Sequence, residues 1–139
     1  MMKNVFLDTN VLIDFMARRE SFYENAAIIF SLGMNGRIKL YVAAMSFATA
    51  SYVVRRSLDK RTLQTMVANI CQYCHVGVVD ADCVMFGASS DFIDFEDAMQ
   101  YHCARKVGAD YIVTRNTKDF ATSLIPVYSP SDFLSAIIE

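Results

Sequence analysis

The sequence predicts an α/β protein, a three-layer α/β/α sandwich built on a mostly parallel sheet of about five strands. Short apolar runs alternate with helical stretches along the chain, which is typical of parallel strands that are covered on both faces. The chain has 139 residues, of which 54% are hydrophobic, so there is ample apolar material for one core. It shows no repeat and no linker, and we expect a single domain over residues 1–139.

Each strand is expected where a short apolar run is bounded by polar or turn-forming residues. The predicted strands are 5–7, 39–43, 76–79, 111–114 and 126–129. The predicted helices are 11–19, 21–33, 46–57, 60–74, 81–90, 94–108 and 131–138. Ser21 is expected to cap the second of these helices and Gly33 to end it, while Gly108 closes the helix that begins at residue 94.

The charge composition excludes some classes of protein. Lys and Arg total 13 and Asp and Glu total 15, which gives a net charge of −2. A protein this balanced can meet nucleic acid only through a local basic patch, not through a global field. Neither a secretory signal nor a run of about 18 apolar residues is present, so we expect a cytoplasmic protein without a membrane span.

The segment CQYCH at residues 71–75 matches the C-x-x-C-H pattern of covalent haem attachment. The favoured interpretation is structural, because the segment lies at the end of a helical pattern where small cysteines face a core. No second pair of metal ligands with tight spacing is present, which argues against zinc. All four cysteines, Cys71, Cys74, Cys83 and Cys103, are therefore expected to be reduced thiols.

Polar residues gather at the carboxyl ends of the predicted strands, where parallel α/β sheets place their sites. Asp8 follows the first strand, Ser46 and Thr49 follow the second, and Arg115, Asn116 and Asp119 follow the fourth. A further group of acids, Asp94, Glu96 and Asp97, opens the helix at 94–108. Each stretch alone has a local explanation, because acids cap helices and favour the helix dipole.

Three of these acids, Asp8, Asp97 and Asp119, converge if their strands are neighbours. Carboxylates about 5 Å apart repel by roughly 3 kcal/mol per pair at an effective dielectric constant of about 20, so such a cluster needs a counter-charge. Oxygen ligands suit Mg²⁺ or Mn²⁺, and such an ion can contact a phosphate and activate a water molecule. The cluster therefore indicates metal-assisted hydrolysis of phosphodiesters.

The stretches VFLDTNVLIDF, DFEDA and VTRNTKDF, in this order and spacing, resemble the PIN domain family. The resemblance covers nearly the whole chain and implies an α/β/α sandwich with a ribonuclease site that depends on Mg²⁺ or Mn²⁺. Many small bacterial members are similar to VapC-type toxins, which implies an antitoxin protein as partner, RNA as substrate and a homodimer.

The resemblance also assigns residues. The catalytic positions of the family correspond to Asp8, Asp97, Asn116 and Asp119. The implied metal ligands are Asp8, Asp97 and Asp119, and the same helix adds two further acids, Asp94 and Glu96. The implied supporting residues are Asn10, Ser46, Thr49 and Thr114. One position departs from the family pattern, because Thr49 stands where members usually carry Glu. Asn116 stands where members carry either Asp or Asn. We expect weaker metal binding than in the most acidic members.

The cations expected to contact RNA phosphates are Arg115 and Lys118, beside the acids, and Arg55 and Arg56, after the helix that follows the second strand. Two other functions remain open. A PIN fold with a degenerate, inactive metal site could bind RNA or a protein without cutting. A phospho-acceptor receiver would use Asp80 or Asp82, but it would also need a Lys after the fifth strand, which the sequence lacks.

Overall fold

The computed structural model describes residues 2–137 and has one five-stranded sheet in the order β3-β2-β1-β4-β5. All four strand pairings are parallel, so the predicted fold class is confirmed. The strands are β1 (Asn4–Leu7), β2 (Lys39–Ala43), β3 (Cys74–Gly77), β4 (Tyr111–Val113) and β5 (Val127–Tyr128). The helices are α1 (Thr9–Met16), α2 (Tyr23–Met34), α3 (Ala44–Val54), α4 (Lys60–Ile70), α5 (Ala81–Ser89), α6 (Phe95–Lys106), the short 3-10 helix η1 (Thr117–Phe120) and α7 (Pro130–Ile137).

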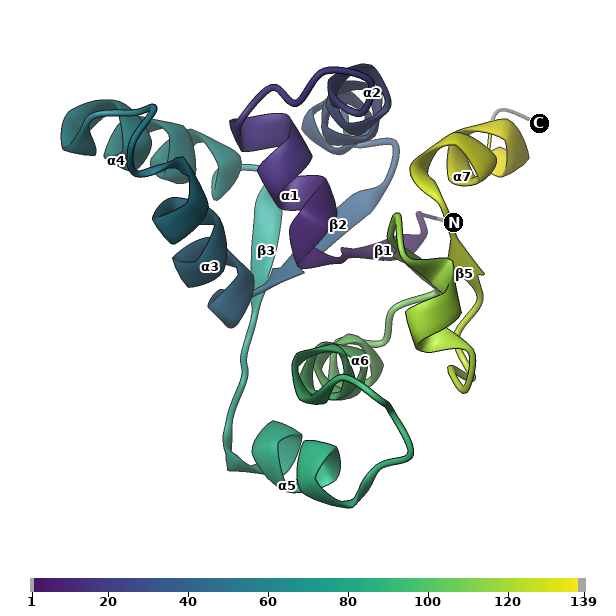
Figure 1. Cartoon of the computed structure of the whole chain (residues 1–139). Helices are drawn as coiled ribbons and strands as arrows, with labels where there is room; N and C mark the ends of the chain where they lie inside the picture. The colour runs from purple at the N-terminus through teal and green to yellow at the C-terminus, as the bar shows by residue number, and fades with distance from the viewer. Residues whose placement is uncertain (1, 138–139) are drawn as a thin grey trace.

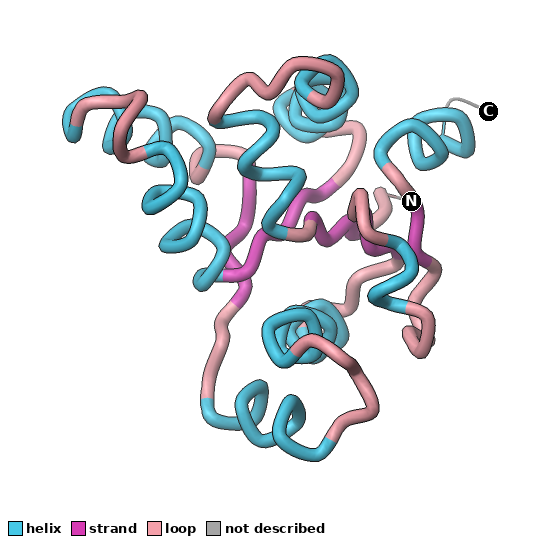
Figure 2. Tube along the Cα trace, viewed as in Figure 1, coloured by secondary structure: helices cyan, strands magenta, loops and turns pink. Residues whose placement is uncertain are grey.

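Helices cover both faces of the sheet, with α1 to α4 and α7 on one side and α5 and α6 on the other (Figures 1 and 2). The strands of the sheet are buried on both sides because successive side chains point to opposite faces. In β1, Val5 and Leu7 belong to the core under α1 and α2, whereas Phe6 belongs to the core under α6. This double burial explains why the strands appear as continuous apolar runs in the sequence.

Strand β1 lies at the centre of the sheet: β2 and β3 are added on one side of it, and β4 and β5 on the other. Val5 pairs with Leu40 on one side and with Tyr111 on the other. The segments that follow β1 and β4 lead to α1 and η1, which pack on opposite faces of the sheet, and parallel sheets of this topology bind ligands in a crevice at such a point. The first and last thirds of the chain therefore meet at this point.

The start of β3 differs from the sequence prediction. The strand begins at Cys74, two residues earlier than predicted, and α4 ends at Ile70 instead of running on to Cys74. Cys71 is exposed in the turn between them, so its expected place against a core is wrong, whereas Cys74 is buried. The cysteines of CQYCH therefore lie on a turn and a strand, and all four cysteines of the chain are free thiols, as predicted.

The junction between α1 and α2 is also less regular than predicted. Helix α1 ends at Met16, and Arg18 and Ser21 adopt positive φ angles of 51° and 76°. Ser21 therefore does not cap α2, whose N-cap is Phe22.

Gly33 does not end α2, and its role is packing. A Cβ atom at Gly33 would lie only 2.4 Å from Leu40 Cδ1, so the glycine permits close contact between α2 and β2. Gly108 has a φ of +71° directly after α6, as its predicted closing role requires.

No helix within residues 2–137 is both long and apolar enough to cross a lipid bilayer.

Candidate metal centre

Asp8 occupies the crevice at the carboxyl end of β1. Its backbone is extended and its side chain caps α1, with Oδ1 accepting a hydrogen bond from the Thr9 amide at 2.7 Å. The backbone amide of Asp8 donates to the Val113 carbonyl at 2.9 Å, which ties the residue to the end of β4. Asp8 therefore caps helix α1, but the cap uses only one of its two carboxylate oxygens.

The second carboxylate oxygen of Asp8 is held by residues from both sides of the crevice. Thr114 Oγ1 donates to Asp8 Oδ2 at 2.7 Å, and Asn10 Nδ2 approaches the same oxygen at 3.3 Å. Asp8 is only 4% exposed, and its burial raises the pKa of the carboxyl group, while hydrogen bonds from Thr114 and Thr9 oppose this rise. The supporting roles predicted for Asn10 and Thr114 thus correspond to direct contacts with Asp8.

Behind Asp8 lies a buried polar chain that links three elements. Thr9 Oγ1 and Ser46 Oγ are 2.6 Å apart, and Ser46 Oγ donates to Gln100 Oε1 at 3.4 Å. Gln100 also hydrogen-bonds Asp8 and thereby lowers the pKa of that carboxyl group. Sequence reasoning missed Gln100, although its position one helical turn after Asp97 puts both residues on one face of α6.

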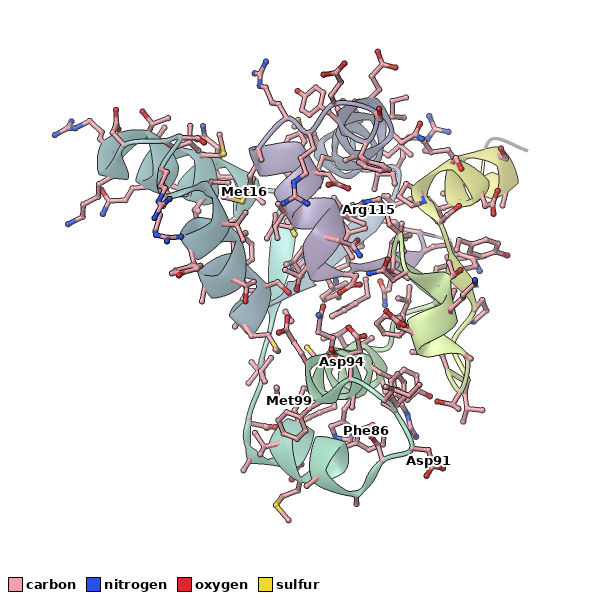
Figure 3. All side chains as sticks on the ribbon, in the orientation of Figure 1. Met16, Phe86, Asp91, Asp94, Met99 and Arg115 are labelled. Atoms are coloured by element: carbon pink, nitrogen blue, oxygen red, sulfur yellow. The ribbon has the colours of Figure 1, made fainter. Side chains whose placement is uncertain are left out.

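The acids at the start of α6 face Asp8 across the crevice. Asp94 is the N-cap of α6 and accepts a hydrogen bond from the Asp97 amide at 2.9 Å, and Figure 3 shows Asp94 at this end of the helix. Burial and then the charge of Asp8 raise the pKa of Asp97 to about 7, with smaller contributions from Asp94, Asp119 and Glu96. Burial, together with Asp94 and Asp8, also raises the pKa of Glu96.

Asn116 and Asp119 complete the site from the loop after β4. The Asn116 amide donates to Thr114 Oγ1 at 3.0 Å, and the Asp119 amide donates to the Asn116 carbonyl at 3.0 Å. Both side chains are exposed, and Asp119 lies in η1. Asp119 is close enough for its charge to raise the pKa of Asp8 and Asp97.

These side chains fit a divalent cation in two respects. Every candidate ligand is a carboxylate or amide oxygen, which is the ligand type that Mg²⁺ and Mn²⁺ prefer. Burial is the main cause of the raised pKa of Asp97, and the negative charges of neighbouring acids add to it, so a bound cation would relieve the repulsion among them. Within residues 2–137, no three His, Cys, Asp or Glu side chains are grouped closely enough to hold an ion as they stand.

Thr49 lies one helical turn after Ser46 on α3 and is partly buried. Residues three apart on a helix share a face, so Thr49 lies on the side of α3 that carries the buried Ser46. No carboxylate is present on α3, whose sequence is AMSFATASYVV. Helix α3 therefore contributes no acid to the candidate site.

The predicted RNA-binding cations are not gathered into one patch. Arg55 and Arg56 are exposed where α3 ends, and the Arg55 guanidinium stacks on Tyr52, with 3.7 Å between Cζ and the ring centroid. Lys118 is exposed in η1, next to Asp119. Their contact with RNA stays a prediction.

Arg115 faces a different partner from the one expected. It lies beside α1 (Figure 3), where Nε donates to Asp14 Oδ2 at 2.7 Å and Nη2 donates to Asp14 Oδ1 at 3.2 Å. Asp14 is 1% exposed, so this two-point ion pair is largely buried. Asp14 is the one charge within the apolar helix TNVLIDFM, but the sequence alone does not say that it is buried or that it pairs with Arg115.

The receiver hypothesis finds no support in the surroundings of Asp80 and Asp82. Asp80 caps α5 and forms an ion pair with Lys106 at 2.7 Å, and Asp82 lies 3.7 Å from the same Lys106 nitrogen. The hydrogen bond from Lys106 is the main reason why the pKa of Asp80 lies below its usual range. These acids have a structural role in joining α5 to α6.

The fold and site together define an α/β protein with an acid-lined crevice at the point where the order of its parallel strands reverses. The sequence profile of the PIN domain family matches residues 4–118. This match covers most of the chain, and the chain therefore belongs to the PIN domain family. The family expected from the three sequence stretches is confirmed.

Several individual proteins are similar to the chain. Ribonuclease VapC1 of Aquifex aeolicus (strain VF5) is 24% identical over 135 residues, which cover 94% of this chain and 93% of that protein. A toxin-antitoxin complex from Klebsiella pneumoniae contains a chain that is 18% identical, with a TM-score of 0.68 and coverage of 91% of this chain and 97% of that one. VapBC2 from Rickettsia felis, bound to a DNA fragment from its promoter, gives 18% identity, a TM-score of 0.63 and the same coverage. At this level of identity, the solved structures show a shared fold.

Proposed function

We propose that this protein is an endoribonuclease that hydrolyses RNA phosphodiester bonds with Mg²⁺ or Mn²⁺ in the cytoplasm. The observation that carries the proposal is the crowding of negative charge on Asp97, whose pKa is raised to about 7 by burial and by Asp8, Asp94, Asp119 and Glu96. Acids that raise one another's pKa in this way create a site at which a divalent cation would be stabilised. Ribonuclease VapC1, the similar protein from Aquifex aeolicus, supports RNA as the substrate.

In this proposal, Asp8, Asp97 and Asp119 hold the ion, and Asp94 and Glu96 add negative charge to the rim. A bound divalent ion would lower the pKa of an attacking water molecule and would stabilise the negative charge that develops at the phosphate. Thr114 and Thr9 orient the Asp8 carboxylate, and Asn116 is held beside it through its contact with Thr114. Gln100 and Ser46 support the site from beneath.

We also propose that the protein is the toxin of a toxin-antitoxin pair. The similar structures from Klebsiella pneumoniae and Rickettsia felis are a toxin-antitoxin complex and a VapBC pair, and each shares its fold with this chain over 91% of this chain and 97% of its own. An antitoxin protein is the expected partner, and a homodimer is the expected assembly. Sedimentation of the purified chain, alone and with the product of a neighbouring gene, tests both expectations.

The decisive experiment is cleavage of several single-stranded RNAs with Mn²⁺ or Mg²⁺ by wild type, Asp8→Asn and Asp97→Asn. We expect cleavage by wild type that requires the metal and is lost in both variants, because each variant removes a ligand charge while preserving shape. Asp110→Asn is the matched control, because Asp110 Oδ2 bonds the Asn4 amide at the other end of β1. Cleavage that persists in Asp8→Asn would refute the assigned metal centre.

A non-cutting binding module is the second candidate, and Thr49 is the observation that favours it. With Thr in place of an acid, and with Asn116 as a neutral residue, the site carries fewer charges than the most acidic form of the family pattern. This candidate predicts RNA or protein binding without turnover under any metal. Absence of cleavage by wild type with both metals and all RNAs would select it.

A further inference from the structure

A pocket of about 490 Å³ lies beside the candidate metal centre and is lined by Ser21, Phe22, Asn25, Arg115, Ser129 and Ser131. One of its lining residues, Arg115, belongs to the same loop as Thr114 of the candidate metal centre. Arg115 directly follows Thr114, which hydrogen-bonds Asp8, and the Arg115 amide approaches Asn10 Oδ1 at 3.3 Å. The size falls within the range of about 300–1,000 Å³ that is typical of small-ligand sites.

The polar groups of this pocket suit a phosphate. A guanidinium has five N–H groups, and the two contacts with Asp14 leave others for a second acceptor. Within the described part of the chain, Arg115 is the sole charged residue of the lining, and no carboxylate faces the pocket. Hydroxyl groups of Ser21, Ser129 and Ser131 add donors around it.

The pocket also presents an aromatic ring suited to a nucleobase. Phe22 is 42% exposed, and Arg115 Cζ lies 4.0 Å from the centroid of its ring. The guanidinium covers one face of the ring, so a base would stack on the other face, in the way that proteins use aromatic side chains for single-stranded nucleic acids. The ion pair with Asp14 fixes the guanidinium in place, so the ring and the cation form one rigid surface.

We propose that this pocket binds one nucleotide of a single-stranded RNA, with its phosphate on Arg115 and the serine hydroxyls and its base on Phe22. Arg115 directly follows Thr114, which hydrogen-bonds Asp8, so a strand anchored here contacts the same loop that contributes to the candidate metal centre. This inference rests on the proposed ribonuclease function, because that function makes RNA the expected ligand. RNA binding can nevertheless be measured without cleavage, so the two can fail separately.

The test compares two carboxylates added to the same helix. Ser131→Glu places a negative charge in the pocket, whereas Ser135→Glu places it on an exposed position of α7 outside the lining. A carboxylate in the first turn of α7 favours the helix dipole, so Ser131→Glu keeps the fold, and thermal unfolding checks this. The probe is a fluorescein-labelled uridine-rich RNA, measured by fluorescence anisotropy in EDTA.

We expect Ser131→Glu to weaken RNA binding by about tenfold and Ser135→Glu to leave it within about twofold. Phe22→Ala should weaken binding by about fivefold or more, and Phe22→Trp should restore it, because base stacking needs a ring. Equal affinities for the two Glu variants, or for Phe22→Ala and wild type, would overturn the nucleotide pocket whether or not the protein cleaves RNA. No detectable RNA binding by wild type would overturn it as well. Loss of binding in Ser131→Glu by a protein that never cleaves RNA would retain the pocket and refute only the nuclease.

Discussion

At the scale of single residues, Asp97 has the clearest consequence for pH dependence. Its pKa is raised from 3.8 to about 7, first by burial and then by neighbouring acids. Between these two values the folded state holds a proton that the unfolded state has lost, so the contribution of Asp97 to stability is largest below about pH 4 and is lost as the pH rises through about 7. A metal ion bound at the site should reverse this loss.

Asp97→Asn should therefore stabilise the metal-free protein by about 1–2 kcal/mol near pH 8 and leave it unchanged near pH 4. The full pKa shift of Asp97 would correspond to a larger change in the free energy of unfolding. Because Asp97 is only half-buried, solvent screening reduces this change. Urea unfolding at the two pH values measures the change. Asp91→Asn, in the exposed loop away from α6 (Figure 3), is the control and should behave like wild type. A variant no more stable than wild type near pH 8 would contradict the expectation.

Thr49 leads to the second prediction at this scale. Thr49→Glu adds a carboxylate on the face of α3 that carries Ser46, and additional ligand charge strengthens metal binding. We expect Mn²⁺ affinity to rise by about tenfold and RNA cleavage to rise with it. Calorimetric titration with Mn²⁺ measures the affinity, and Thr49→Gln is the control for size. If the Glu and Gln variants bind Mn²⁺ equally, Thr49 does not face the ion.

The sequence was informative about residues with a chemical pattern and silent about residues defined by burial. Asp8 and Asp97 were predicted from their positions at a strand end and a helix start. Gln100 and Asp14 were not, because nothing in a single sequence states that a polar side chain will be buried. Gln100 matters through its contacts with Ser46 and Asp8, and both partners are distant in the sequence.

At the scale of elements, the ion pair between Arg115 and Asp14 joins the loop after β4 to α1. Removal of one partner from a buried pair leaves an uncompensated charge and costs about 3–5 kcal/mol. Arg115→Met should therefore destabilise the fold, and the addition of Asp14→Leu should restore most of the loss. Any effect of Arg115→Ala on RNA binding must then be separated from this loss of stability.

A double-mutant cycle by urea unfolding checks the coupling between the two residues. Arg19 lies 3.7 Å from Asp14 Oδ1, and its side chain is 41% exposed, so Arg19→Met is the control and should cost less than about 1 kcal/mol. Additive effects of Arg115→Met and Asp14→Leu would show that the pair contributes no specific stability.

Element order and type were predictable from the sequence, whereas element ends were not. The alternation of apolar runs with helical spacing fixed five strands and the helices between them, because burial on both faces leaves a strong pattern. The end of α2 was misplaced because a glycine was interpreted as a helix stop when it serves contact with Leu40. The start of β3 was misplaced because Cys74 suits a helix end and a buried strand equally well.

At the scale of the whole molecule, a net charge of −2 predicts a shallow salt dependence of RNA binding. Lys118 and Arg115 follow β4, and Arg115 can offer a phosphate only the N–H groups that its pair with Asp14 leaves free. We expect about two to four phosphate contacts, which corresponds to a slope of about −1.4 to −2.8 for log affinity against log salt.

Lys118→Ala should make this slope shallower by about 0.7, because it removes one contact beside the site. Arg37→Ala is the control, because Arg37 precedes β2 and lies at the amino end of the sheet, opposite the crevice. Fluorescence anisotropy over a range of NaCl concentrations gives each slope. Equal changes for both variants would indicate a diffuse field instead of a local patch.

The pairing of β1 with β4 brings Asp8 beside Thr114, and the hydrogen bond between them spans 106 positions of the chain. This arrangement can therefore form only after the chain has been synthesised as far as β4, since contacts between distant segments form only after both are available. Prematurely terminated products that lack β4 contain Asp8, Asp94 and Asp97 but have no scaffold to hold them together. Under the proposed ribonuclease function, chains still on the ribosome would therefore be inactive until β4 has been synthesised.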